Sequence, residues 1–200
     1  MNGRLIIIGA GGHGRVVRDI AENCAHYSEI YFLDDDFQKD SDVIGCVNDF
    51  EKFLENSDFA VAIGNNYTRE KILNKLLTRE ACLPSLVHPK AVVAKGVQIK
   101  DGTVVMAGAV INTGASIGKG VIINTCSSVD HDCTIGDFCH ISVGAHLAGT
   151  VTLGERTFLA IGSSVINNIK IAPDCILAAG AVAVNDLTEK GVYKGIPAKK

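Results

Sequence analysis

Residues 129–153 read VDHDCTIGDFCHISVGAHLAGTVTL, and they show the repeat that governs half of the chain. An aliphatic residue returns at every sixth position of this stretch, and the spacing continues in both directions from Val93 to Ala183. Four positions after each aliphatic residue comes a second register of mostly small residues. A six-residue period fits neither an α-helix nor a long flat strand, but it is typical of a coil of short strands in which each hexad forms one wall of a prism.

The repeat predicts a β-helix with three walls in each coil of about eighteen residues. Its aliphatic residues should point inward, and successive coils should pair their backbones about 4.8 Å apart. The repeat then contains roughly five coils. We therefore expect a repeat domain over residues 83–200, including a tail from Gly191 that caps the open end, and a separate domain over residues 1–82.

Composition and charge narrow the class of protein. Hydrophobic residues make up 47% of the chain and aromatic residues only 6%, which suits a narrow β-helix interior. The net charge is −3 without a basic stripe, so we expect no nucleic-acid binding. The apolar run at residues 5–8 is too short for a signal peptide or a membrane span, so a cytoplasmic location is expected by default.

The seven cysteines are expected to be reduced thiols, because their number is odd and no two form a CxxC pair. Cys133, Cys139 and Cys175 fall on the small register and should act as small core residues. The alternative is a zinc site formed by His131, Cys133, Cys139 and His140, but the two cysteines should face inward. We therefore expect no metal.

The amino-terminal residues predict the start of a Rossmann-like α/β domain. Residues 4–8 should form a buried strand, followed by the loop GAGGHG at residues 9–14 and a helix over residues 13–24. Bare backbone N–H groups at the positive end of such a helix can hold a phosphate. This loop is therefore a candidate phosphate site.

A second strand over residues 29–33 ends in Asp34, Asp35 and Asp36, which could bind a ribose hydroxyl or a base N–H of a nucleotide. The remaining elements expected here are a helix near residues 48–55, a strand over 59–63, a turn at Gly64-Asn65-Asn66 and a helix over 68–78. Residues 81–90 carry two prolines and should connect the domains. His88, within this connection, is expected to be a linker residue and not a catalyst.

The glycine loop and the acids match the dinucleotide fingerprint, so NAD is one candidate ligand. A dinucleotide fold needs two mononucleotide halves, however, and only about eighty residues precede the repeat. We therefore expect this loop to bind the nucleoside diphosphate moiety of a nucleotide sugar. The remaining alternative is a plain βα turn in which the glycines serve tight packing.

His131 lies two residues past the inward-facing Val129, which predicts an outer edge of the prism for it. The neighbouring Asp132 can fix the tautomer of the ring and stabilise the imidazolium, as general-base catalysis requires. The dipeptide alone leaves a second interpretation equally open, namely a solvated surface histidine beside an acid.

The order of these motifs resembles bacterial nucleotide-sugar N-acetyltransferases, which acetylate the amine of UDP-linked 4-amino-4,6-dideoxy sugars such as the bacillosamine precursor. Sialic acid O-acetyltransferase-like proteins are closely related to this family. The likeness covers almost the whole chain, from GGHG through Asp-Asp, IGNN and the His-acid-Cys of the repeat to the closing GIPAK at 195–199. It implies a small α/β Rossmann-like domain followed by a left-handed parallel β-helix, a homotrimer, and acetyl-CoA as the donor.

The resemblance also implies the site residues. His131 is the base, and Asp132 raises its basicity. The residues expected to bind the UDP moiety are Gly11, Gly12, His13, Asp34, Asp35 and Gly64, and those expected to contact acetyl-CoA are His140, Ile161 and Ala179. Two departures from the family are visible: Asp132 stands where the bacillosamine enzymes have Glu, and Ala178-Ala179 stands where glycines are expected. The shorter acid reaches the ring differently, and the two alanines narrow the path of the pantetheine arm.

We therefore expect direct attack of the sugar amine on the thioester, with a backbone N–H or His140 stabilising the oxyanion. Residues eighteen apart should stack on one edge, so Ile161 and Ala179 share an edge that does not include His131. The resemblance and this arithmetic together predict an active site built from two chains of the trimer. The rival functions are an O-acetyltransferase acting on sialic acid or another sugar, and a non-catalytic nucleotide-sugar sensor or scaffold.

Overall fold

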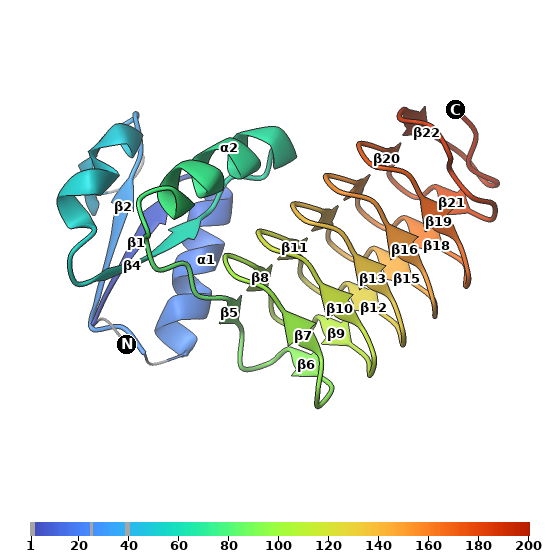
Figure 1. Ribbon diagram of the computed structural model, residues 1–200, viewed down its shortest axis with the longest axis horizontal. Coiled ribbons are helices and arrows are strands. Elements are labelled where there is room, and N and C mark those ends of the chain that lie inside the picture. The colour runs from blue at the N-terminus through green and yellow to red at the C-terminus, as the bar shows by residue number, and fades with distance from the viewer. Residues whose placement is uncertain (1–2, 25, 39–40) are drawn as a thin grey trace.

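The computed structural model describes residues 3–24, 26–38 and 41–200, and it has two parts packed against each other (Figure 1). The first part is a four-stranded parallel sheet with helices, and the second is a β-helix of short parallel strands that extends away from it. A Rossmann-like domain followed by a hexapeptide-repeat β-helix is confirmed.

The amino-terminal sheet has the strand order β3-β2-β1-β4. Its strands are β1 (Arg4–Ile8), β2 (Glu29–Leu33), β3 (Val43–Gly45) and β4 (Ser57–Val61), and its helices are α1 (Gly12–Asn23), the 3₁₀ helix η1 (Val47–Phe53) and α2 (Asn66–Leu77). Leu5, Ile6, Ile7 and Ile8 are completely buried, as expected for a central parallel strand covered on both faces. The apolar run of the sequence is therefore the centre of this sheet.

Several elements of this part differ from the prediction. The strand expected over residues 59–63 is β4, which starts at Ser57 because its two polar residues are buried in parallel pairing with β1. The last predicted helix starts at Asn66, because the side chain of Asn65 accepts a hydrogen bond from the Thr68 amide and caps it. The helix near residues 48–55 is the 3₁₀ helix η1, and β3 was missed because it has only three residues.

The β-helix has three parallel sheets. The seven-stranded sheet contains β5 (Leu86–Val87), β8 (Val104–Val105), β11 (Ile122–Ile123), β14 (His140–Ile141), β17 (Phe158–Leu159), β20 (Ile176–Leu177) and β22 (Val192–Tyr193). The six-stranded sheet contains β6 (Val92–Val93), β9 (Val110–Ile111), β12 (Ser128–Val129), β15 (His146–Leu147), β18 (Ser164–Val165) and β21 (Val182–Ala183). The five-stranded sheet contains β7 (Gln98–Ile99), β10 (Ser116–Ile117), β13 (Thr134–Ile135), β16 (Thr152–Leu153) and β19 (Lys170–Ile171).

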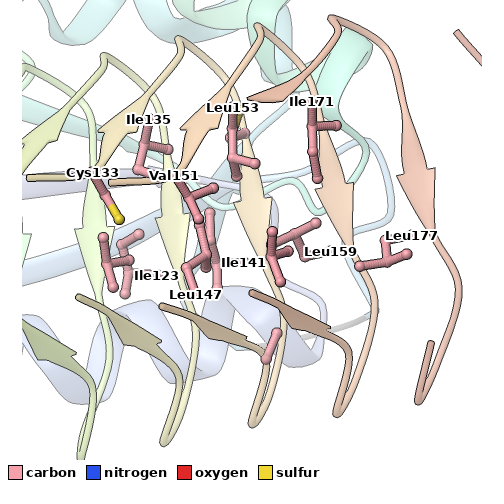
Figure 2. Packing of buried hydrophobic residues seen from close by; sticks show 14 of the residues in the cluster. Ile123, Cys133, Ile135, Ile141, Leu147, Val151, Leu153, Leu159, Ile171 and Leu177 are labelled. Carbon is pink, nitrogen blue, oxygen red and sulfur yellow. The ribbon is translucent and has the colours of Figure 1, made fainter. Parts of the chain in front are cut away.

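Both registers of the repeat form the interior of the β-helix. Side chains of the aliphatic register stack in columns through the coils, as Ile141, Leu159 and Leu177 do in Figure 2. Cys133, Cys139 and Cys175 of the small register are completely buried, so their predicted role as core residues is confirmed. All seven cysteines are free thiols.

The β-helix includes part of the segment that was predicted to connect the two domains. β5 pairs with β8, so Leu86 and Val87 belong to the seven-stranded sheet and not to a connection that runs to residue 90. The prediction of roughly five coils was therefore too low, and about six are present. His88 is buried, and its Nδ1 accepts a hydrogen bond from the Lys90 amide.

The two parts share a hydrophobic interface on the outer face of the seven-stranded sheet. Leu86, Val104 and Ile122 from its first strands join the cluster that contains Leu5 and Ile7 of β1. On the side of α2, Leu73 and Phe138 belong to a second shared cluster. This packing brings the end of β4 and the start of α2 against the coils that carry His140 and Phe158.

Candidate active site

His131 lies on an outer edge of the β-helix, which we call the His131 edge. It is formed by the turns at 130–132, 148–150 and 166–168, which join the six-stranded sheet to the five-stranded sheet. The Thr150 amide donates a hydrogen bond to the His131 carbonyl at 2.8 Å, and the Asn168 amide donates to the Gly149 carbonyl at 3.0 Å. The backbone of His131 is thus held by the next coil, while its side chain remains 54% exposed.

The imidazole of His131 is paired with its neighbour. Nδ1 lies 2.9 Å from Oδ2 of Asp132, whose φ of +58° turns its carboxylate back toward the ring. This hydrogen bond raises the pKa of His131 above its ordinary value. A carboxylate can only accept, so Nδ1 carries a proton and the neutral ring has its lone pair on Nε2. No group in the described part of the chain bonds to Nε2, which suits a general base.

Asp130 and Asn112 support this turn, and the sequence prediction missed them. Oδ1 of Asp130 accepts from the His131 amide and from Nδ2 of Asn112, both at 2.7 Å. The two bonds hold the pKa of the Asp130 carboxyl below its ordinary value. Asn112 lies eighteen positions before Asp130, so the period of the repeat would have identified this contact.

Ile161 and Ala179 lie together on a different edge, which we call the Ile161 edge. It is formed by the turns at 142–144, 160–162 and 178–180, between the seven-stranded and six-stranded sheets. The Gly180 amide donates to the Ile161 carbonyl at 3.0 Å, and the Ile161 side chain is 57% exposed. The His131 and Ile161 edges are the two borders of the six-stranded sheet. A wall of one hexad, about 15–20 Å, therefore separates them.

The glycine loop lies between β1 and α1, where Gly11, Gly12 and His13 start the helix. Gly11 is the N-cap and has no side chain to satisfy the first amides, so bare N–H groups are available to an anion. A β-carbon on Gly14 would overlap the Gly9 carbonyl, so this glycine serves the packing of helix against loop. Gly64 follows β4 and faces open space.

The two acids after β2 are placed differently. Asp34 is buried, and its carboxylate accepts from the Ala10 amide at 2.8 Å and from the Asp36 amide at 2.9 Å. Asp34 thus holds the glycine loop in place. Asp35 is exposed, although its Oδ1 accepts from the Val47 amide at 3.1 Å. Of the two, Asp35 is the one with a surface open to a ligand.

His140 lies on the outer face of β14 and not on the Ile161 edge. Its Nε2 lies 3.1 Å from Nδ2 of Asn124, and the Thr125 amide fixes that side chain by donating to its Oδ1. Because Nδ2 only donates, Nε2 of His140 accepts and the proton sits on Nδ1, which leaves Nδ1 for the Gly64 backbone. Burial lowers the pKa of His140 to about 3, and Arg69 and His13 add to this effect. His140 is thus neutral and fully engaged within the protein.

Arg69 of α2 is a buried cation that ties the two parts together. It is only 1% exposed, and its guanidinium donates to the carbonyls of Ile63 at 2.9 Å, Gly120 at 2.7 Å and Phe138 at 2.7 Å. Burial and the charge of Arg69 lower the pKa of His13 to about 4. Nε2 of His13 is buried, and none of the described residues bonds to it. Sequence reasoning missed Arg69, because no periodicity marks it.

A cavity of about 310 Å³ opens beside Gly64. Its walls are formed by Gly64, Asn65, Asn66, Tyr67, Arg156, Phe158, Asp174, Ile176 and Lys190. Tyr67 donates to Oδ1 of Asp174 at 2.8 Å, and Arg156 bonds the same atom at 2.7 Å, so a polar network closes one side. Phe158 and Ile176 of the seven-stranded sheet add apolar surface to the lining. Such a mixed lining suits a sugar more than a bare phosphate.

Neither a metal-ligand cluster nor a membrane-spanning helix occurs among the described residues. No group of three or more His, Cys, Asp or Glu side chains in residues 3–24, 26–38 and 41–200 is placed to hold a metal ion. Within the same residues, every helix is too short or too polar to cross a membrane.

Comparison with known proteins identifies the family. Residues 4–76 match the family described as the PglD N-terminal domain. The acetyltransferase domain of PglB from Neisseria gonorrhoeae, solved with acetyl coenzyme A, is 40% identical with a TM-score of 0.96, over 100% of this chain and 99% of that one. The chain belongs to the bacterial nucleotide-sugar N-acetyltransferases of the bacillosamine type. The predicted family and the acetyl-CoA-dependent class of enzyme are thereby confirmed at the level of the family.

Two further relatives show the range of substrates in this N-acetyltransferase family. A UDP-N-acetylbacillosamine N-acetyltransferase of Bacillus subtilis is 33% identical over 108 residues, and the match spans 50% of this chain and 50% of that protein. PerB from Caulobacter crescentus, solved with CoA and GDP-perosamine, is 36% identical with a TM-score of 0.91, over 100% of this chain and 97% of that one. The relatives thus bind amino sugars linked to different nucleotides.

Proposed function

We propose that this chain transfers the acetyl group of acetyl-CoA to the amine of a UDP-linked 4-amino-4,6-dideoxy sugar. The observation that carries this proposal is the His131–Asp132 pair on an exposed edge. Nδ1 of His131 carries a proton and donates a hydrogen bond to Asp132, and none of the described residues bonds to Nε2. The glycine loop and Gly64 supply the bare backbone that suits the diphosphate. The family membership supplies the donor.

The mechanism has one nucleophilic attack and no covalent enzyme intermediate. Nε2 of His131 removes a proton from the sugar amine as the nitrogen attacks the thioester carbonyl. A backbone N–H stabilises the oxyanion, since the His140 ring has no free N–H to offer. Collapse of the tetrahedral intermediate breaks the C–S bond, and the imidazolium returns its proton to the departing CoA thiolate.

The active site is proposed to be shared between two chains of a homotrimer. Proton transfer requires base and amine within about 3 Å, yet the His131 edge and the Ile161 edge lie at opposite borders of one sheet. A neighbour packed about a threefold axis would bring its Ile161 edge to this chain's His131. The donor, held near Ile161 and Ala179 of one chain, would then meet the base of the next.

Mixing two inactive variants tests the shared site. His131→Ala lacks the base, and Ala179→Trp blocks the donor edge with a bulky ring. After dissociation and reassembly, about one interface in three of each mixed trimer would contain two intact halves and regain turnover. A mixture that stays inactive despite proven subunit exchange would place the whole site within one chain.

GDP-perosamine bound to a 36%-identical relative supports a second candidate, a GDP-linked amino sugar. A thiol-release assay with acetyl-CoA separates the candidates when run against UDP-amino sugars, GDP-amino sugars and sialic acids. The proposal predicts turnover with a UDP-amino sugar at least about 100-fold above the others in kcat/KM. Turnover with the GDP sugar alone would show that the substrate is linked to GDP and not to UDP. Turnover with sialic acid alone would show that the enzyme acetylates an oxygen and not a nitrogen.

A further inference from the structure

The turn at Gly149 lies against the imidazole of His131, one coil further along the β-helix. A β-carbon built on Gly149 would lie 2.5 Å from Cε1 and 3.0 Å from Cδ2 of His131, and closer still to Nε2. Carbon atoms do not approach ring atoms this closely without displacing them. The ring of His131 therefore rests on bare backbone that only glycine provides.

The backbone of this turn does not itself demand glycine. Thr113, His131, Gly149 and Asn167 occupy the same place in successive coils, and three of the four carry side chains. Gly149 also lies outside the set of glycines with positive φ, the conformation that favours glycine over other residues. The imidazole is thus the reason that a β-carbon is excluded at this position.

A second glycine clears space on the other side of the pair. A β-carbon on Gly114, one coil before Asp132, would overlap Oδ1 of that acid. Gly114 has a φ of +75°, so its backbone favours glycine as well. Gly149 is the cleaner of the two positions to test, because substitution there adds no backbone strain.

We propose that Gly149 is a positioning residue for the general base. Its missing side chain lets the imidazole of His131 lie against the next coil, with Nδ1 bonded to Asp132 and Nε2 left available to accept a proton. The main chain of His131 is fixed by the Thr150 amide and by Asp130, so an added methyl group can move only the ring. Such a rotation separates Nδ1 from Asp132. The inference rests on the proposed role of His131, but the contact itself does not.

The test is Gly149→Ala, read by NMR titration of the His131 ring and by steady-state kinetics. We expect the pKa of His131 to fall from its raised value toward the ordinary 6.5, because the ring leaves Asp132. We expect kcat to fall roughly 10–100-fold while KM for both substrates stays within about twofold. Lys95→Ala is the matched control: Lys95 is exposed in the same column, two coils before His131, and both readouts should stay unchanged.

The outcomes separate the two proposals. An unchanged His131 pKa in Gly149→Ala overturns the positioning role. A lowered pKa with unchanged turnover supports the contact and overturns His131 as the base.

Stability supplies a second readout that holds even if the single variant fails to fold. If the added methyl group clashes with the His131 ring, Gly149→Ala should lower the free energy of unfolding in the wild type but not in the His131→Ala background. An equal cost in both backgrounds means that the turn itself requires glycine, which also overturns the inference.

Discussion

The His131 edge and the interface between the two parts hold their histidines in opposite environments. His131 is exposed beside a carboxylate, which raises its pKa. His13 and His140 are enclosed near the Arg69 guanidinium, and their pKa values fall to about 4 and about 3. The first histidine can exchange a proton near neutral pH, and the other two remain neutral. The charged neighbour of each imidazole and the burial of its ring therefore decide which histidine can serve as a base.

Removing the exposed ring should have the largest effect on turnover. His131→Ala eliminates the proton acceptor, so we expect kcat to fall by roughly 10²–10⁴. Nucleotide binding, measured by calorimetry with UDP, should remain, because the glycine loop lies on the other part of the chain. Near-normal turnover in this variant would show that catalysis does not depend on the exposed environment of His131.

Removing the buried cation should instead affect stability. Arg69→Met keeps the length of the side chain but leaves carbonyls of Gly120 and Phe138 buried and unpaired, so we expect a loss of about 3–5 kcal/mol in the free energy of unfolding. Relief of guanidinium desolvation offsets only part of this, since the acceptors stay buried. Urea unfolding measures the loss.

Arg79→Met is the control for the buried cation. Arg79 pairs with Glu51 on the surface, where both side chains are more than half exposed. Its loss should cost no more than about 1 kcal/mol. Equal stability of the two variants would show that Arg69 does not hold the parts together.

Asp132→Asn should have a smaller effect on turnover, because the imidazole remains. We expect kcat to fall roughly 10-fold, less than in His131→Ala. The folded pKa of His131 is raised, so wild-type activity should be lost as the pH falls through a value above 6.5. Without the carboxylate this acidic limb should move to lower pH. A pH–rate profile of kcat/KM checks the shift, and an unmoved limb would contradict the role of Asp132.

The smallest effect expected is that the buried rings of His13 and His140 do not titrate near neutral pH. Between pH 8 and pH 5.5, the NMR signals of the His131 ring should shift as it gains a proton. Those of His13 and His140 should stay constant, because their pKa values lie at about 4 and about 3. Titration of either buried ring near pH 6.5 would show that the interface is open to water. The His131→Ala and His140→Phe variants assign the signals.

Much of the β-helix could be read from the sequence because its neighbours are set by a fixed period. Residues eighteen apart meet in adjacent coils, so the edge shared by Ile161 and Ala179 followed from counting, and the bond from Asn112 to Asp130 could have been found the same way. The glycine loop and β1 were equally readable, because a buried strand leading into glycines is a local signal.

The tertiary structure alone decided what the two parts do to each other. The position of His140 against Gly64 and the bonds of Arg69 to carbonyls of both parts join residues with no periodic relation. The protonation of His13 and His140 follows from that packing, because burial and a nearby cation both disfavour the charged ring. A sequence pattern fixes distances along a repeat, but the dielectric and the charges around a side chain depend on every element that packs over it.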